Sequence, residues 1–197
     1  MIRELQERDR NEILAFFRAL GQEDRYRRFG RVMADQAVAS YVGQLDWSEG
    51  VFLGAYDAYV RLVGLLELAQ VPNGSCEIAV VVDSAHRGRG IGKALMDRAL
   101  LKAKVHGCAR VVLLCQVDNE PMRRLARSAG LTSTTEDGEV EGHMELPHAA
   151  LADVTEALTR DAIGNATYAS LLASRALGEL FQNAMRATAR AAEPHGS

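Results

Sequence analysis

The feature that most constrains the fold is a succession of four patterns between Cys76 and Val117. CEIAVVVD, from Cys76 to Asp83, is apolar and β-branched, which is typical of a strand. The glycine-rich segment HRGRGIGK follows, and Gly92 to His106 then repeats apolar residues at helical spacing. ARVVLLCQV, from Ala109 to Val117, is almost wholly apolar, as expected of a strand buried on both faces. Strand, helix and strand over this length predict a right-handed βαβ unit with two parallel strands.

Antiparallel strands and helices are predicted on both sides of this unit. Residues 51–58 and 59–71 are apolar and aromatic runs joined near Asp57, which predicts an antiparallel pair. Residues 132–146 predict a final hairpin that turns at Glu136, Asp137 and Gly138. The remaining predicted elements are an edge strand over 2–5, a helix over 9–20 with Asp9 as N-cap and Glu12 three residues on, a helix over 35–45, and a helix that begins after Asp118 and Asn119, has Pro121 in its first turn and ends at Gly130. We therefore expect an α/β fold, an α+β mixed sheet in which an antiparallel meander leads into the βαβ unit, with helices on both faces.

Pro147 marks a predicted boundary between two parts of the chain. Residues 1–147 are expected to form the α/β domain. Residues 148–197 are expected to form an Ala-rich helical extension whose last residues, EPHGS, are disordered. One apolar stripe at helical spacing in this extension consists of Leu177, Leu180, Phe181 and Ala184. Two interpretations stay open: the helix completes the core of its own chain, or it joins two copies of the chain into a homodimer.

Charge and hydropathy argue against two classes of partner. The chain has 197 residues and a formal net charge of −3, which gives no electrostatic footprint for nucleic acid. No apolar stretch reaches the ~18 residues needed to span a bilayer. The first residues, MIRELQERDRNE, are charged where a secretory signal would be apolar. We therefore expect no nucleic-acid partner, no membrane association and a cytoplasmic location.

The cysteines and histidines give no sign of a metal site. Cys76, Cys108 and Cys115 show no CxxC spacing, and their odd number predicts a reduced protein. Within apolar strands, the first and third are interpreted as buried structural thiols rather than acyl acceptors. His143 and His148 are expected to have surface or packing roles. Because no cluster of His, Cys and carboxylate residues has metal spacing, we expect no metal.

The glycine-rich segment predicts a binding site for an anion. Glycines between a strand and a helix expose backbone N–H groups, and the first four N–H groups of a helix have no partner within it. The helix dipole adds partial positive charge at the same place, and Arg87, Arg89 and Lys93 strengthen it. The alternative is a tight turn that uses glycine for conformation alone. Three alternating glycines with three cations favour the anion site.

Two common phosphate motifs are not matched by this segment. The dinucleotide fingerprint GxGxxG fails because Lys93 or Leu95 stands where its last glycine should be. The P-loop GxxxxGK[ST] fails because Arg87 replaces its first glycine and Ala94 its Ser or Thr. The anion is therefore not expected to belong to a dinucleotide or a P-loop nucleotide.

The segment does match the pattern Arg87-x-x-Gly90-x-Gly92, after a strand and at the start of an amphipathic helix. This pattern resembles the acetyl-CoA pyrophosphate loop, [QR]xxGx[GA], of the GNAT superfamily of N-acetyltransferases. Two further segments, LGQEDRYRRFG and NEPMRRLARSAGL, are similar to segments of the bacterial Pat-type protein lysine acetyltransferases within that superfamily. The resemblance covers roughly residues 1–146 and implies the GNAT fold.

The resemblance also implies where acetyl-CoA, the acetyl donor, binds. In that family the strand before the loop splays away from the following parallel strand and pairs with the pantetheine arm. This assigns the arm to Val80, Val81 and Val82, whose amides could also polarise the thioester carbonyl. Asn119 would contact the arm from the start of the next helix, besides capping that helix. The pyrophosphate would be held by the loop residues Arg87, Gly88, Arg89, Gly90, Ile91, Gly92 and Lys93.

Acetyl transfer to an amine is helped by a base, because an alkylamine with a pKa near ~10.4 is mostly protonated at neutral pH. Glu77 is the candidate. Its carboxylate interrupts an apolar strand, where burial would raise its pKa, and it matches the glutamate assigned as general base in the Pat-type proteins. The alternative is a carboxylate that faces solvent, and Glu67 on the neighbouring strand is the second candidate. Many relatives use a tyrosine after the leucine of the late helix as general acid. Here Ala126 follows Leu125, so we expect the thiolate to leave without a tyrosine acid.

These motifs do not identify the acceptor amine. The resemblance favours direct transfer to a protein lysine. The alternatives are a small-molecule amine acetyltransferase and a non-catalytic acyl-CoA-binding regulatory module. We expect Arg25, Tyr26, Arg28 and Phe29 to lie on a helical segment that borders the acceptor site. The alternative is that they form a solvated basic face with aromatic residues packed beneath it.

Overall fold

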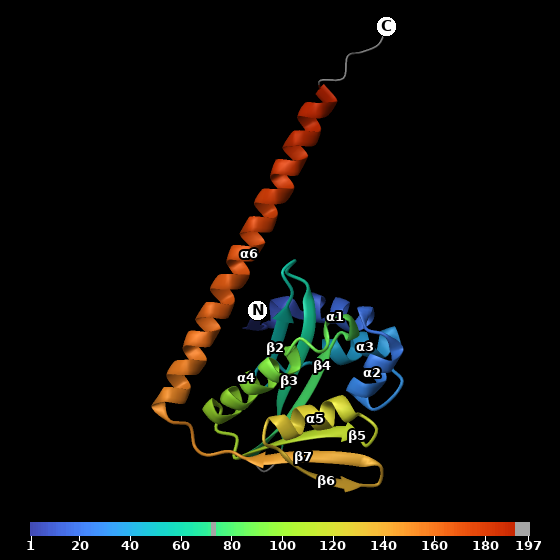
Figure 1. Cartoon of the computed structure of the whole chain (residues 1–197), viewed down its shortest axis with the longest axis vertical. Coiled ribbons are helices and arrows are strands. Elements are labelled where there is room, and N and C mark those ends of the chain that lie inside the picture. Colours follow the sequence, from blue (N-terminus) through green and yellow to red (C-terminus); the bar gives the residue numbers. More distant parts are fainter. Residues whose placement is uncertain (72–73, 192–197) are drawn as a thin grey trace.

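The computed structural model describes residues 1–71 and 74–191. Its centre is a seven-stranded mixed sheet in the order β1-β2-β3-β4-β5-β7-β6, with helices on both faces (Figure 1). The strands are β1 (Ile2–Glu4), β2 (Val51–Tyr56), β3 (Leu62–Val71), β4 (Ser75–Val82), β5 (Arg110–Gln116), β6 (Thr132–Glu136) and β7 (Glu139–Glu145). The helices are α1 (Arg10–Ala19), α2 (Gln22–Phe29), α3 (Asp35–Gly43), α4 (Ile91–Val105), α5 (Glu120–Ser128) and α6 (Leu151–Ala191). The mixed α/β sheet expected from the sequence is confirmed.

The strands form the predicted meander and βαβ unit. β1 to β4 pair with their neighbours in antiparallel fashion, and β4 then pairs with β5 in parallel, with α4 as the crossover. β7 lies between β5 and β6, so the final hairpin joins the sheet through its second strand. Asp137 and Gly138 both have positive φ angles, 48° and 83°, as a two-residue hairpin turn of this kind requires.

Alternating side chains build one core on each face of the sheet. On one face, residues such as Leu66 pack with Leu95 of α4, and α5 completes this core. On the other face, residues such as Leu65 pack with Phe17 of α1, and α3 completes that core. The middle strands lie between the two cores, which positions the C-terminal end of β4, where the glycine-rich turn begins.

β5 is buried on one face only, contrary to the prediction from its composition. Val111, Leu113 and Cys115 are buried in the core with α4 and α5, whereas Leu114 on the opposite face is 50% exposed. Among the residues that the structure describes, the core beneath α1 and α3 includes none from β5. The apolar composition of this strand therefore does not indicate helices on both of its sides.

Asp9 occupies the predicted N-cap position of α1, but its side chain makes no capping hydrogen bond to that helix. Its carboxylate accepts two hydrogen bonds from Arg3, both 2.9 Å long, and one from the amide of Gln6 at 2.8 Å. The Arg3 side chain is only 2% exposed and lies 4.0 Å from the centre of the Tyr168 ring. Because a buried guanidinium needs a paired charge, Asp9 serves Arg3 rather than the helix.

Cys76 and Cys108 form a disulfide bond, and Cys115 is a buried free thiol. The prediction of reduced cysteines was therefore wrong for this pair. Ser75 and Arg110 are paired where β4 and β5 begin, so the residues beside them are close in space although the cysteines are 32 positions apart. Disulfides are typical of oxidising compartments, so the cytoplasmic location stays a prediction that this bond does not favour.

The first half of α6 packs on the domain. Ala157 is buried, and Tyr168 and Leu171 pack against the core beneath α1 and α3. A Cβ atom at Gly164 would lie 2.4 Å from the carbonyl oxygen of Ile2, so helix and β1 approach more closely than a side chain would allow. This half of the helix completes the core of its own chain, as one of the two interpretations expects.

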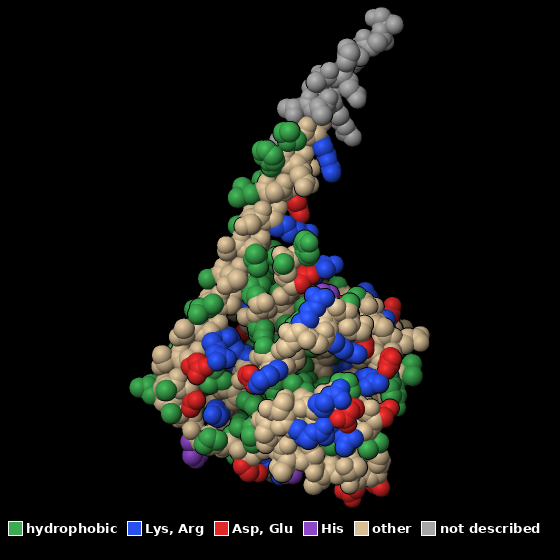
Figure 2. Space-filling view, viewed as in Figure 1, with side chains coloured by type: hydrophobic (Ala, Val, Ile, Leu, Met, Phe, Trp, Pro, Cys, Tyr) green, Lys and Arg blue, Asp and Glu red, His purple; other side chains and the backbone are tan. Residues whose placement is uncertain are grey.

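The second half of α6 projects beyond the rest of the domain, with hydrophobic side chains along it (Figures 1 and 2). Leu177, Leu180 and Phe181 are 67%, 65% and 69% exposed, so their stripe does not complete the core. The side chain of Ala184 and the segment EPHGS lie outside the described residues. Pairing of the stripe with a second copy, and the domain boundary at Pro147, stay predictions.

The described part of the chain contains no helix with an apolar stretch long enough to cross a membrane.

Candidate active site

The glycine-rich segment forms the turn between β4 and α4. Gly88 and Gly90 have φ angles of +73° and +77°, in the left-handed region that glycine adopts without strain. A Cβ atom at either position would meet nothing within 4 Å, so open space adjoins the backbone there. Gly92 differs: it has no positive φ angle, and its Cβ atom would lie 3.4 Å from Leu125 of α5. The first two glycines thus shape the turn, and the third allows α4 and α5 to pack closely.

The start of α4 presents backbone amides toward this open space. The first hydrogen bond along the helix runs from the amide of Ala94 to the carbonyl oxygen of Gly90, at 3.0 Å. The amides of Ile91, Gly92 and Lys93 precede it, and no side chain caps this end of the helix. Free amides at a positive helix end favour a bound anion.

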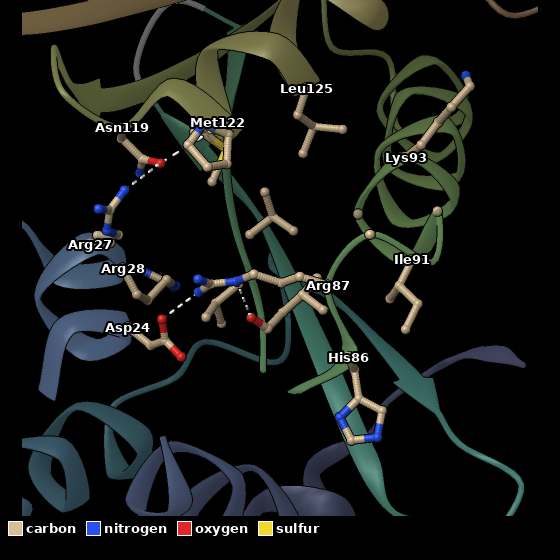
Figure 3. A pocket seen from close by; sticks show the side chains of 17 residues that line it. Asp24, Arg27, Arg28, His86, Arg87, Ile91, Lys93, Asn119, Met122 and Leu125 are labelled. Carbon is tan, nitrogen blue, oxygen red and sulfur yellow. Dashed lines mark hydrogen bonds and ion pairs between the residues drawn. The ribbon is translucent and has the colours of Figure 1, made fainter. Parts of the chain in front are cut away.

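A cavity of about 260 Å³ lies beside this turn, between β4, α2 and α5 (Figure 3). All but one of the residues that the sequence assigns to the donor line it: Val80, Val81, Val82, Arg87, Gly88, Gly90, Ile91, Gly92, Lys93 and Asn119. The exception is Arg89, whose side chain bonds the carbonyl oxygen of Ala85 at 3.3 Å. The ammonium group of Lys93 pairs with Asp97 at 3.2 Å, away from the cavity.

β4 and β5 pair only over their first residues. Ser75, Cys76 and Glu77 pair with residues 110–112, and beyond them the two strands are not paired. The amide of Asp83 donates a hydrogen bond to the carbonyl oxygen of Val63 in β3. Successive residues of a strand direct their backbone N–H and C=O groups to opposite sides, so those of Val80 and Val82 face away from β3, toward the gap between β4 and β5. Those of Val81 face β3. The splayed strand pair that the resemblance implies is present, and it leaves an unpaired strand edge along the cavity.

Three side chains of α2 reach the elements around this cavity. Asp24 accepts a hydrogen bond from Arg87, and Arg27 donates one to Asn119 at 3.4 Å (Figure 3). Arg28 pairs with Glu67 of β3 at 2.6 Å. Sequence reasoning missed the first two residues. Asp24, Arg27 and Arg28 stand at positions i, i+3 and i+4. This spacing was the signal that could have placed all three on one face of a helix.

The segment flagged beside the acceptor site divides into two groups. Arg28 and Phe29 line a second cavity of about 200 Å³. Arg25 instead bonds backbone carbonyl groups of its own region, including that of Leu20 at 3.2 Å, and Tyr26 is 44% exposed. Only part of the segment therefore borders a cavity.

Glu77 lines the second cavity, which shares the walls formed by Arg27, Arg28, Val80 and Met122 with the first. The side chain is half-buried rather than enclosed, and it has no hydrogen-bond or ion-pair partner within the described ranges. It lies at the end of the paired part of β4, where the strands separate. The cavity that contains a free carboxylate therefore adjoins the cavity with the free amides.

Glu67 lies on the same face of the sheet but is fully engaged. Its carboxylate accepts hydrogen bonds from Arg28 and from the hydroxyl of Tyr41. Burial, together with this carboxylate, raises the pKa of Tyr41 above its ordinary value, against the opposing charge of Arg28. Tyr41 therefore stays a neutral hydrogen-bond donor. The carboxylate of Glu67 holds Arg28 and Tyr41 in place and is not free to accept a further proton.

Asn119 caps α5, as predicted. Its side-chain oxygen accepts a hydrogen bond from the amide of Met122 at 3.3 Å, and Pro121 lies in the first turn. The residue is only 4% exposed, yet it lines the first cavity. The structure thus shows the capping role and places the side chain beside the cavity. Within residues 1–71 and 74–191, no group of three or more His, Cys, Asp or Glu residues is arranged to hold a metal ion.

Free amides at a helix start, an unpaired strand edge and an adjoining carboxylate suit a ligand that has a phosphate at one end and extends along a strand. The sequence model of the acetyltransferase (GNAT) family matches residues 11–131, and the chain belongs to this family. A mycothiol acetyltransferase of Saccharopolyspora erythraea is 36% identical over 76 residues, which are 38% of this chain and 25% of that protein. The chain thus matches about a quarter of the length of this relative.

Solved structures share the fold. The GNAT domain of S. lividans PAT has a TM-score of 0.64 and 23% identity, and the match covers 74% of this chain and 89% of that one. A spermidine N-acetyltransferase from Vibrio cholerae, in complex with CoA and spermine, has a TM-score of 0.60 and 17% identity over 74% of this chain and 94% of that one. A putative acetyltransferase from Salmonella typhimurium with its cofactor acetyl-CoA has a TM-score of 0.58 and 19% identity over 76% and 95% of the two chains.

Proposed function

We propose that the protein is an acetyl-CoA-dependent N-acetyltransferase that transfers the acetyl group directly to a primary amine, with a protein lysine as the favoured acceptor. The observation that carries this proposal is the junction of the two cavities at Val80 and Met122. It joins an anion site at the start of α4 to a free carboxylate at Glu77. Membership of the GNAT family and neighbours whose names include CoA or acetyl-CoA support the donor.

The donor would bind along the first cavity. The amides from Arg87 to Lys93 would hold the pyrophosphate, because open space adjoins Gly88 and Gly90 and a helix start favours an anion. The exposed backbone edge at Val80 and Val82 would pair with the pantetheine arm, and Asn119 would contact the arm from α5. When bound, the donor supplies an activated acyl group and a thiolate leaving group.

Glu77 would act as the general base. A base needs a lone pair that is free to accept a proton from the amine, directly or through one water molecule. Glu77 has no partner within the described residues, whereas Glu67 already accepts hydrogen bonds from Arg28 and Tyr41. The geometry therefore favours the first carboxylate over the second. The thiol, with an ordinary pKa near ~8.5, would leave as a thiolate and need no tyrosine acid.

Two classes of acceptor amine have support. A protein lysine is supported by the resemblance of LGQEDRYRRFG to the Pat-type proteins and by Leu114 of β5, which lines the second cavity and is 50% exposed. The second candidate is a small-molecule amine, because two of the similar proteins, a mycothiol acetyltransferase and a spermidine N-acetyltransferase, carry the names of small molecules.

Glu77→Gln tests the base. We expect turnover to fall by about 10²- to 10⁴-fold while the Kd for CoA stays unchanged, because the amide keeps the shape of the side chain and cannot accept the proton. Glu136→Gln is the matched control, since Glu136 is a strand glutamate outside both cavities. Full turnover in the Glu77 variant, or an equal loss in the control, would remove Glu77 as the base.

The acceptor class is tested by CoA release measured with intact protein substrates, spermidine, aminoglycosides and amino acids. Acceleration by lysine-containing proteins alone supports the favoured acceptor. Acceleration by one small amine transfers the proposal to that class. Tight acetyl-CoA binding without acceptor-dependent release would favour a regulatory module.

A further inference from the structure

Arg87 does not extend freely into solvent but lies across the first cavity (Figure 3). Its Nη2 atom donates to the carboxylate of Asp24, and its Nε atom donates to the carbonyl oxygen of Val82 at 3.1 Å. The Asp24 side chain is only 7% exposed, whereas that of Arg87 is 40% exposed. A nearly buried carboxylate of α2 therefore holds the guanidinium that leads the glycine turn.

These contacts use the strand edge that the proposed function gives to the donor and a cation that stands beside the proposed pyrophosphate site. A pyrophosphate would take the Arg87 guanidinium, and the pantetheine arm would take the strand edge that includes the carbonyl oxygen of Val82. Asn119 is engaged in the same way, since it accepts a hydrogen bond from Arg27 at 3.4 Å. The cavity of about 260 Å³ is also smaller than the ~300–1,000 Å³ of most ligand sites, and side chains of α2 and of the turn form part of its wall.

A carboxylate and a phosphate that bind the same guanidinium lie close together and repel each other. Both are anions, and their repulsion is strong where little water lies between them. Asp24 is the acidic residue that lines this cavity, and its charge faces the place where the donor's negative charge would come. Neutral and basic residues make up the rest of the wall.

We propose that Asp24 is an internal competitor of the donor's pyrophosphate for Arg87, so that this residue sets the affinity for the donor. The proposal rests on the proposed function, since it takes the pyrophosphate of acetyl-CoA as the competing anion. Donor binding transfers the guanidinium from the carboxylate to the phosphate and frees the first turns of α2. Because Arg27 and Arg28 of the same helix line both cavities, donor binding also changes the wall beside Glu77.

Asp24→Asn tests the competition while keeping the shape of the side chain. We expect the Kd for CoA, measured by titration calorimetry, to fall by about tenfold, because one charge-assisted hydrogen bond no longer competes. The Kd for pantetheine, which lacks the pyrophosphate, is expected to change by less than about twofold. Glu23→Gln is the matched control: it makes the same change in net charge one residue away, at a side chain that is 74% exposed and pairs with Arg27. We expect it to leave the Kd for CoA within about twofold.

The outcomes separate this proposal from the function on which it rests. Wild-type protein that binds no CoA refutes the donor itself, and the competition with it. Wild-type protein that binds CoA, with an Asp24→Asn variant that binds it equally or more weakly, overturns only the competition. Equal gains for CoA and pantetheine overturn it as well, because pantetheine carries no phosphate.

A second measurement uses the unaltered chain, so it tests the proposal even if the Asp24→Asn variant does not fold. Hydrogen exchange of the α2 amides from Arg25 to Phe29 is expected to rise when CoA is added and to stay constant with pantetheine. Unchanged or slower exchange with CoA overturns the competition.

Discussion

Gly90→Ala separates the two reasons for a glycine at the start of α4. Gly90 has a φ angle of +77° and precedes the first residue of the helix. Alanine in this left-handed conformation costs about 1–2 kcal/mol of unfolding free energy. The new Cβ atom would meet no protein atom within 4 Å, so we expect no further loss from a clash.

The same methyl group should weaken donor binding, because the cavity and the free amides of Ile91, Gly92 and Lys93 adjoin this position. A phosphate kept from two of these amides loses two charge-assisted hydrogen bonds. We expect the Kd for CoA to rise by about tenfold to a hundredfold, which corresponds to about 1.4–2.8 kcal/mol.

Gly138→Ala is the matched control. Gly138 has a φ angle of +83° in the turn between β6 and β7, and a Cβ atom there would also meet nothing within 4 Å. The two variants therefore carry the same backbone strain, but only Gly90 lines the cavity. Urea unfolding should show a similar loss of stability in both, and calorimetry should show weaker CoA binding in the Gly90 variant alone. Equal Kd values for the two folded variants would refute the assignment of this turn to the pyrophosphate.

Two further predictions concern parts of the chain away from the cavities. Burial alone would raise the pKa of Asp9, but hydrogen bonds from Arg3 and Gln6 lower it below its ordinary value of 3.8. The stability that Asp9 contributes is therefore present above that pKa and is lost as the pH falls, so urea unfolding of Asp9→Asn should show lower stability at neutral pH and a flatter decline between about pH 5 and pH 3 than the wild type. If the exposed stripe on α6 pairs with a second copy, Leu180→Lys should convert a sedimenting dimer into a folded monomer, and an unchanged sedimentation coefficient would contradict the pairing.

The order and type of the elements followed from sequence because each element has a local cause. The βαβ unit combines two apolar strands, a glycine turn and an amphipathic helix. The turn of the final hairpin could be predicted because Asp137 and Gly138 are residue types that adopt positive φ angles. What failed depended on partners distant in sequence. Asp9 has the residue type of a helix cap, but buried Arg3 takes its carboxylate. Leu114 has the residue type of a buried position, but the core beneath α1 and α3 includes no described residue of β5.

The candidate site shows the same division. The glycine pattern placed the free amides and the cavity correctly on α4, because that pattern is local. The disulfide between Cys76 and Cys108 could not be read from spacing, since only the parallel pairing of β4 with β5 brings the two residues together. Likewise, no periodicity of α2 says that Asp24 faces Arg87, which follows it by 63 positions.

α2 connects the proposed donor site to the proposed acceptor site. Within eight residues it supplies Asp24 to Arg87, Arg27 to Asn119 and Arg28 to Glu67, and it lines both cavities. A change on this helix that widens the cavity beside Glu77 therefore also alters the contacts of the glycine turn. A sequence that exchanges α2 for that of another family member should shift acceptor preference and CoA affinity together. Exchange of the hairpin formed by β6 and β7, which touches neither Asp24 nor Arg87, should leave CoA affinity unchanged.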